Sequence, residues 1–221
     1  NINLPSGVVN INGGAGSLFS IQNGTKTVTP SGGATLNFGS NVTVALNSGM
    51  NFGANTSTIN GTLQIALGGF VSTNAPSYAV GSTLRYFTGS AYGRGVEWST
   101  NVGPGYPHHV VVDQNGTVTT VNLAAGSGIC EIAGNLTINN GANVNMGAMA
   151  NPLIVRGNLS IGSTSSGSLT LSTTTGGDVK VAGNLTRNTG GTLTQNGREV
   201  EMNGTTPQTI AGIATFDFLS I

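Results

Sequence analysis

Residues 83 to 112 contain most of the side chains in this chain that could bind a ligand. The only tryptophan and both histidines lie in this stretch, together with arginine, glutamate and tyrosine. Aromatic and charged groups gathered in a chain of otherwise low charge indicate a binding site. The candidate ligand-binding residues are Tyr92, Arg94, Glu97, Trp98, Tyr106 and His108.

The same stretch also fits a purely structural role. An ion pair between Arg94 and Glu97, together with a packed Trp98, would pin a loop against the rest of the protein. The chain would then return to a sheet through Val110–Val112. The residue types are compatible with both interpretations.

Catalytic chemistry has little support in this sequence. A glycosidase needs two carboxyl groups about 5–9.5 Å apart. Glu199 and Glu201 alternate with inward apolar residues and so share an outer face, but the adjacent Arg198 indicates ordinary surface charge. No nucleophile elbow or phosphate-binding loop is present, and the spaced aspartates of calcium-binding coils are missing. We therefore expect a non-enzymatic protein without a cofactor.

Metal and thiol chemistry are equally unsupported. His108 and His109 are adjacent, so on a strand they point to opposite faces and cannot chelate together. Cys130 is the only cysteine and stands among apolar residues, which favours a buried, unreactive side chain. We predict neither a metal site nor a disulfide.

The composition excludes several classes of partner. The 221 residues include 36 glycines, and charged residues make up 6%, with seven basic and seven acidic side chains in balance. Such a chain has no field that would collect nucleic acid or anionic lipid. No apolar run approaches the ~18 residues that span a membrane. Disorder is disfavoured because 37% of residues are hydrophobic and occur in short alternating bursts.

A repeated phrase predicts the fold. Gly-Asn-Leu followed by Ser or Thr is expected at one corner of a coil, and each copy precedes strands of alternating apolar and polar residues. The copies begin at Gly134, Gly157 and Gly183, which gives periods of 23 and 26 residues. About three short strands per period describe one coil of a right-handed parallel β-helix. Recurring Asn-Gly pairs predict left-handed backbone at the corners. The alternation after Leu185 would point Arg187 inward.

The principal rival is an antiparallel β-sandwich, because Asn-Gly is also a hairpin signal. The grouping of strands in threes favours the solenoid. We predict amino-terminal coils over residues 1–82, a non-repeating insertion packed on the solenoid over 83–112, and carboxy-terminal coils over 113–221. We expect Leu136, Leu159 and Leu185 to stack in neighbouring coils.

The sequences at the two chain termini lead to an expectation about binding partners. The first residues lack a signal-peptide pattern, and the last ones stop within a strand-like pattern that includes Phe216, Phe218 and Ile221. An open solenoid end exposes strand edges and apolar core. We expect the chain to be an internal piece of a longer one. Other segments of that chain, or a partner protein, would then cover the solenoid end.

Residues 80 to 221 resemble the β-strand-repeat regions of very large secreted surface proteins of Bacteroidota, which the type nine secretion system exports. The resemblance rests on "YGRGVEWS", "GPGYPHHVVV", the Gly-Asn-Leu phrases and "REVEMNGTTPQTIAG". It implies an extended adhesin-like or gliding-related protein, secreted or held at the cell surface, with no catalytic residue. In that family Arg-Gly-x-Glu-Trp recurs between stretches, which favours the structural role of this segment.

The expected function is that of a non-enzymatic structural or adhesive segment of a long surface protein, in contact with surface glycans. The alternatives are a β-helix that binds or cleaves polysaccharide, and an ice-binding solenoid. The outward residues vary among Thr, Asn, Ser and Gln, whereas an ice lattice needs one residue type in register.

Overall fold

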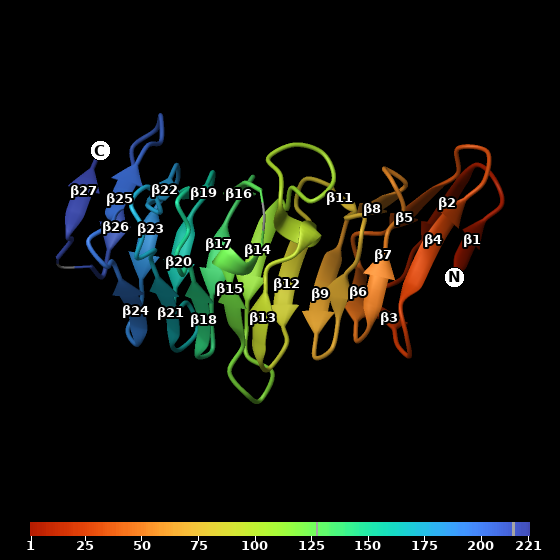
Figure 1. The fold of residues 1–221 in the computed structure, drawn as a ribbon, viewed down its shortest axis with the longest axis horizontal. Helices are drawn as coiled ribbons and strands as arrows, with labels where there is room; N and C mark the ends of the chain where they lie inside the picture. The colour runs from red at the N-terminus through yellow and green to blue at the C-terminus, as the bar shows by residue number, and fades with distance from the viewer. Residues whose placement is uncertain (127, 214) are drawn as a thin grey trace.

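The protein is an all-β solenoid in the computed structural model, which describes residues 1–126, 128–213 and 215–221. Its parallel sheets stack into about nine turns, and the turns follow one another in chain order along the long axis of Figure 1. Every pairing between the named strands is parallel. The predicted β-helix is confirmed, and the antiparallel sandwich is excluded.

One face of the solenoid is a single nine-stranded sheet that runs through nearly all the turns. Its strands, in chain order, are β3 (Ser17–Ile21), β6 (Val42–Leu46), β9 (Thr62–Ala66), β12 (Thr83–Phe87), β14 (His109–Val112), β17 (Leu136–Ile138), β20 (Leu159–Ile161), β23 (Leu185–Arg187) and β26 (Ile210–Ala211).

Each of the other two faces is divided into an amino-terminal and a carboxy-terminal sheet. One amino-terminal sheet contains β1 (Ile2–Leu4), β4 (Lys26–Pro30), β7 (Gly49–Asn51) and β10 (Phe70–Val71). The other contains β2 (Val8–Ile11), β5 (Thr35–Phe38), β8 (Ser57–Ile59) and β11 (Ser77–Tyr78). One carboxy-terminal sheet contains β13 (Ala91–Gly93), β15 (Thr120–Asn122), β18 (Ala142–Asn145), β21 (Gly167–Thr170) and β24 (Gly191–Thr194). The other contains β16 (Cys130–Ile132), β19 (Leu153–Val155), β22 (Val179–Val181), β25 (Glu199–Met202) and β27 (Phe218–Ser220).

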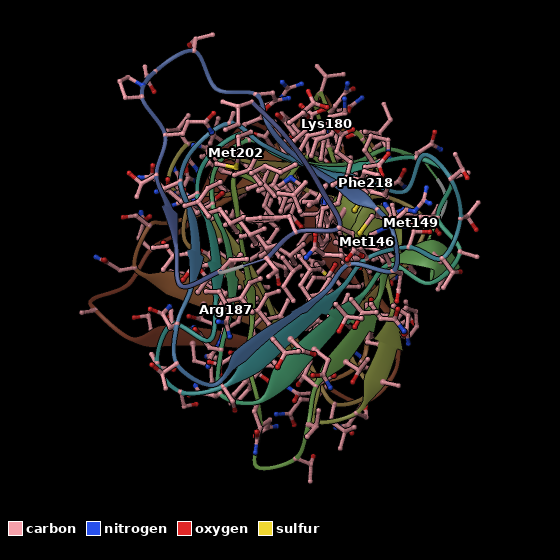
Figure 2. All side chains as sticks on the ribbon, turned by 90° about the vertical axis from the view of Figure 1, so that its left-hand side faces the viewer. Met146, Met149, Lys180, Arg187, Met202 and Phe218 are labelled. Atoms are coloured by element: carbon pink, nitrogen blue, oxygen red, sulfur yellow. The ribbon has the colours of Figure 1, made fainter. Side chains whose placement is uncertain are left out.

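The core consists of columns of apolar side chains, one from each turn. Leu136 pairs with Leu159, and Leu159 with Leu185, as predicted. All three are buried, and Figure 2 shows side chains filling the interior of the coil. Strand residues alternate between inward apolar and outward polar positions, which is the period of a half-buried strand. Burial of these columns is the main stabilising contribution.

The coil is right-handed. Figure 2 views the solenoid from the carboxy-terminal side, so the chain advances toward the viewer. From Lys180 at the top to Arg187 at the left, the chain turns counterclockwise as it advances, which is the right-handed sense.

The Gly-Asn-Leu phrase forms a ladder at one corner of the solenoid. The side-chain oxygen Oδ1 of Asn135 accepts a hydrogen bond from the backbone N–H of Asn158 (2.8 Å), and Asn158 does the same for Asn184 (2.7 Å). A Cβ atom at Gly157 would lie 2.4 Å from Oδ1 of Asn135 and 2.7 Å from the carbonyl carbon of Gly134. The phrase recurs because each turn needs the ladder asparagine and a neighbour without a side chain.

The Asn-Gly pairs do not all serve as predicted. Both residues have positive φ at 23–24, 140–141 and 196–197, and only the glycine does at 115–116. The pairs at 12–13, 60–61 and 203–204 have no positive φ. Gly61 is required there for space, since a Cβ atom would lie 2.3 Å from the carbonyl oxygen of Val42.

The prediction that residues 83–112 leave the coil is wrong. Strand β12 pairs with β9 and β14, so the segment begins and ends in the nine-stranded sheet, and β13 pairs with β15. Residues 83–108 form one turn of the solenoid, and β14 begins the next. Only the third side of the 83–108 turn is irregular, with a short 3-10 helix, η1 (Val96–Trp98), in place of a strand. A second such helix, η2 (Leu123–Ala125), follows β15.

Arg187 takes an inward position, as the alternation predicted. It pairs with Ile161, whose side chain is fully buried, and its guanidinium Nη1 donates to the carbonyl of Gly191 (3.0 Å). The arginine lies on β23, the last strand but one of the nine-stranded sheet, where Leu193 and Ile213 line a hollow with it. A charged group is tolerated in this apolar column because it is only half buried and is hydrogen-bonded.

Candidate functional site

The irregular side of the 83–108 turn joins two sheets that do not pair with each other. On one side lies β11, the last strand of its amino-terminal sheet, and on the other lies β16, the first strand of the carboxy-terminal one. Helix η1 and residues 99–108 occupy the position between them. The carbonyl of Pro76, just before β11, accepts from the N–H of Gly105 (3.0 Å), and the carbonyl of Pro107 accepts from the N–H of Ala133 (3.1 Å).

Two side chains replace the missing strand along the edge of β16. The indole Nε1 of Trp98 donates to the carbonyl of Glu131 (2.8 Å), and Nη1 of Arg94 donates to the carbonyl of Ile129 (3.3 Å). An unpaired strand edge attracts other strands. Here its carbonyl groups are satisfied by Arg94 and Trp98, which are both buried.

Arg94 forms further hydrogen bonds to backbone carbonyls. Its Nε donates to Leu123 (3.2 Å), and Nη1 also donates to the carbonyl of Trp98. In the part of the chain that the structure describes, no ion pair joins Arg94 to Glu97, so the predicted pair is wrong. The turn is indeed held in place, but by arginine binding to carbonyl groups.

Glu97 is fully buried among tyrosines. Its Oε1 accepts from the hydroxyl of Tyr86 (2.9 Å) and from the backbone N–H of Gly95 (2.8 Å). Its Oε2 has no hydrogen-bond partner among the described residues. Burial raises the pKa of the Glu97 carboxyl, and burial beside Glu97 raises the pKa values of the Tyr86 and Tyr78 hydroxyls. The arrangement favours a neutral carboxyl group inside the core.

The remaining predicted site residues lie around this core. Tyr92 is half buried, with its ring centroid 5.4 Å from that of Tyr86. His108 is half buried, and its Nδ1 has no partner in the described part of the chain. Its ring stacks edge-on against His109 at 4.2 Å. His109 occupies the ladder position of the asparagines, and its Nδ1 accepts from the N–H of Asn135 (3.0 Å).

Tyr106 alone among the predicted residues joins an outward polar cluster. Its hydroxyl donates to Oε1 of Glu131 (3.2 Å), and Nε of Arg156 donates to the same oxygen (2.8 Å). Glu131 and Arg156 line a hollow of about 380 Å³ on the outside of β16 and β19. The predicted site thus divides into a buried part, Arg94, Glu97 and Trp98, the half-buried Tyr92 and His108, and a surface part reached by Tyr106.

Sequence reasoning missed Glu131 and Arg156 as candidate site residues. Glu131 stands in "CEI" at the polar position of an alternating strand, and Arg156 follows "LIV" at the end of the next turn's strand. Those signals were visible, but only the pairing of β16 with β19 brings the two residues together. Cys130, the residue before Glu131 on β16, is buried, and burial raises the pKa of its thiol to about 12.

Two other acidic side chains near the surface, Asp113 and Glu201, are paired with cations. Oδ2 of Asp113 lies 2.6 Å from Nη2 of Arg85, and Oε2 of Glu201 lies 2.5 Å from Nζ of Lys180. Among the described residues, no group of three or more His, Cys, Asp and Glu side chains is placed to hold a metal ion.

The fold and this site define a parallel β-solenoid with one irregular, internally hydrogen-bonded turn. Comparison of the chain with protein families, with curated proteins and with solved structures found no match. No helix in the described part of the chain has the length and apolar character needed to cross a membrane.

Proposed function

We propose that this chain is a non-enzymatic structural and adhesive segment of a long protein that is secreted or held at the cell surface. The observation that carries the proposal is the nine-stranded sheet, which continues without interruption through the irregular turn. A continuous parallel ladder makes the solenoid one rigid rod, in which each turn is supported by its neighbours. Such a rod suits the display of other segments at a distance.

The internal hydrogen bonds of the polar side chains in the irregular turn support the same proposal. Arg94, Glu97 and Trp98 form hydrogen bonds within the protein and are buried. They hold the turn where two sheets end. The resemblance of residues 80–221 to surface proteins exported by the type nine secretion system of Bacteroidota agrees with a rod of this kind.

The outward residues favour this function over ice binding. On the sheet that contains β18, one outward row runs Thr120, Asn143, Ser168 and Thr192. A regular lattice match would need the same residue in each turn. The row instead joins its neighbours by side-chain hydrogen bonds, as from Ser168 to Asn143 (2.5 Å).

We also propose that strand β27 is covered in the native setting by another segment or by a partner protein. Phe218 and Leu219 on this strand are 62% and 40% exposed, and exposed apolar strands associate readily. Figure 2 shows Phe218 on the carboxy-terminal side of the solenoid.

Surface labelling tests the location. An antibody raised against the 221-residue chain should label intact cells that make the protein, or their medium. Labelling that appears only after permeabilisation would contradict the proposal. Release of reducing or unsaturated sugar ends from acidic polysaccharides, above a heat-denatured control, would favour the enzymatic alternative.

A further inference from the structure

The hollow on the outside of β16 and β19 has a mixed lining. Its apolar part consists of Ile129, Pro152 and Ile154, and Ile129 is 43% exposed. Its polar part includes the exposed amide of Asn151 and the Glu131–Arg156 pair. An apolar surface with a few convergent polar groups is typical of a small-molecule site.

Glu131 is the unusual member of this lining. Its side chain is only 6% exposed, although it carries a carboxylate and lines the hollow. Both hydrogen bonds that it receives, from Tyr106 and Arg156, go to Oε1. Among the residues that the structure describes, no side chain donates to its Oε2. A carboxylate held by two donors on one oxygen presents the other as a fixed acceptor.

Arg156 supplies the complementary donors. Its side chain is 50% exposed, and Nε is its hydrogen-bonding atom toward Glu131. The terminal nitrogens of the guanidinium are left to donate to a ligand. An acceptor and several donors therefore stand together at the edge of an apolar surface.

These features match a sugar ring. A hexose presents C–H groups on its faces, which contact apolar side chains, and hydroxyls at its rim, each of which both donates and accepts. The charge of Glu131 is balanced by Arg156, so the hollow carries no net charge to attract a carboxylate ligand. A neutral sugar fits this balance better than a uronic acid.

A bound peptide strand fits less well. Extended peptides bind by adding to a free strand edge. The edge of β16 is occupied, because Trp98 and Arg94 take the carbonyls of Glu131 and Ile129, and β19 pairs with the other edge.

We propose that this hollow binds a neutral hexose unit of a surface polysaccharide. The inference rests on the proposed adhesive function and names its ligand class. Glu131 and Arg156 contact adjacent hydroxyls, Tyr106 fixes the orientation of Glu131, and the apolar surface receives the face of the ring.

Titration calorimetry on the whole chain tests the proposal with neutral cello- and manno-oligosaccharides, oligogalacturonate and an unrelated extended peptide. We expect binding of a neutral oligosaccharide, and an affinity loss of roughly 10-fold or more in Arg156→Ala, since a charged hydrogen bond is removed. Asn151→Ala, an exposed change, should weaken binding less. Lys180→Ala is the matched control, because Lys180 forms an outward ion pair on β22 of the same sheet.

Several results would overturn the inference. They are the absence of binding at millimolar sugar, tighter binding of oligogalacturonate or of the peptide, and equal affinities of Arg156→Ala and Lys180→Ala when both are folded by circular dichroism. If intact cells are labelled but no neutral sugar binds, this inference fails and the proposed function stands. If sugar binds but labelling needs permeabilisation, the cell-surface function fails and the sugar site remains.

Discussion

The indole N–H of Trp98 donates a hydrogen bond to the backbone carbonyl of Glu131, 2.8 Å away on the edge of strand β16. This bond connects the irregular turn to the first strand of a new sheet. A side chain thereby does what a neighbouring strand does elsewhere in the solenoid, and the rod continues through a position where no strand forms.

Trp98→Phe should destabilise the protein. The substitution leaves the buried carbonyl of Glu131 without its donor, which costs ~1–3 kcal/mol, and the smaller ring leaves a cavity that adds to this. Chemical denaturation measures the change in the free energy of unfolding. Val102→Ala on the same turn, at a side chain 75% exposed, is the control and should stay within ~0.5 kcal/mol. Equal stabilities of the two variants would show that the indole bond contributes nothing.

Glu97→Gln should remove a pH dependence of stability. Burial raises the pKa of this carboxyl from its ordinary 4.5, so the folded state retains a proton that the unfolded chain releases. Its contribution to stability is complete below pH 4.5 and is lost as the pH rises through the folded-state pKa. The variant should therefore gain stability relative to the original protein as the pH rises.

Denaturation curves from pH 4 to pH 9 for both proteins check this expectation. Their difference isolates Glu97 from the other titrating groups. A constant difference across the range would mean that Glu97 titrates alike in the folded and unfolded states.

His109→Asn should remove a different pH dependence. The neutral ring of His109 accepts a hydrogen bond at Nδ1 from the backbone N–H of Asn135. Burial is the larger cause that lowers the pKa of His109 from 6.5, and the charge of the nearby His108 lowers it further. The stabilisation is therefore present above pH 6.5 and is lost as the pH falls toward the folded-state pKa. Asparagine occupies this ladder position in the next turns, so the variant should fold. A melting temperature that falls equally in both proteins between pH 7 and pH 5 would contradict the assignment.

Gly157→Ala should destabilise far more than its size suggests. The added methyl group would lie 2.4 Å from Oδ1 of Asn135 and 2.7 Å from the carbonyl carbon of Gly134, so the backbone of the turn must move. Gly14→Ala is the control, because no atom lies within 4 Å of its Cβ position. We expect a loss of ~1–3 kcal/mol at Gly157, as in overpacked cores, and almost none at Gly14. Similar melting temperatures for the two variants would refute the close packing at this corner.

Leu159→Ala should cost ~2–5 kcal/mol, because the stacked turns cannot collapse into the gap. Leu159 is 1% exposed, between Leu136 and Leu185. Leu67→Ala, at a leucine 64% exposed, removes the same atoms from the surface and should change little. The comparison is made by the midpoints and slopes of urea denaturation, and a loss below ~1 kcal/mol at Leu159 would place it outside the core.

The repeated phrases were sufficient to predict the solenoid. Alternation of period two assigns each apolar residue to the inside, and recurrence of the same phrase places Leu136, Leu159 and Leu185 in one column. The periodicity was less regular in the first half, where Val44 pairs with Leu63 and Leu63 with Leu84, 19 and 21 residues apart. Alternation and repetition are patterns of neighbouring residues, and for that reason the sequence alone is sufficient to predict their effect on the fold.

The role of residues 83–112 was decided only by the tertiary structure. Its aromatic and charged residues were visible as a cluster. However, Trp98 binds a backbone carbonyl of β16 and Arg94 binds the carbonyl of Ile129, just before that strand, both more than 30 residues later. A carbonyl group exists at every position, so no residue type marks the one that a side chain will reach. The meeting of Tyr106, Glu131 and Arg156 depends likewise on how far the irregular turn extends across the face of the sheet. Sequence by itself determined which residues point inward or outward in the repeated turns, because that follows from local alternation, whereas the three-dimensional stacking decided which outward residues meet.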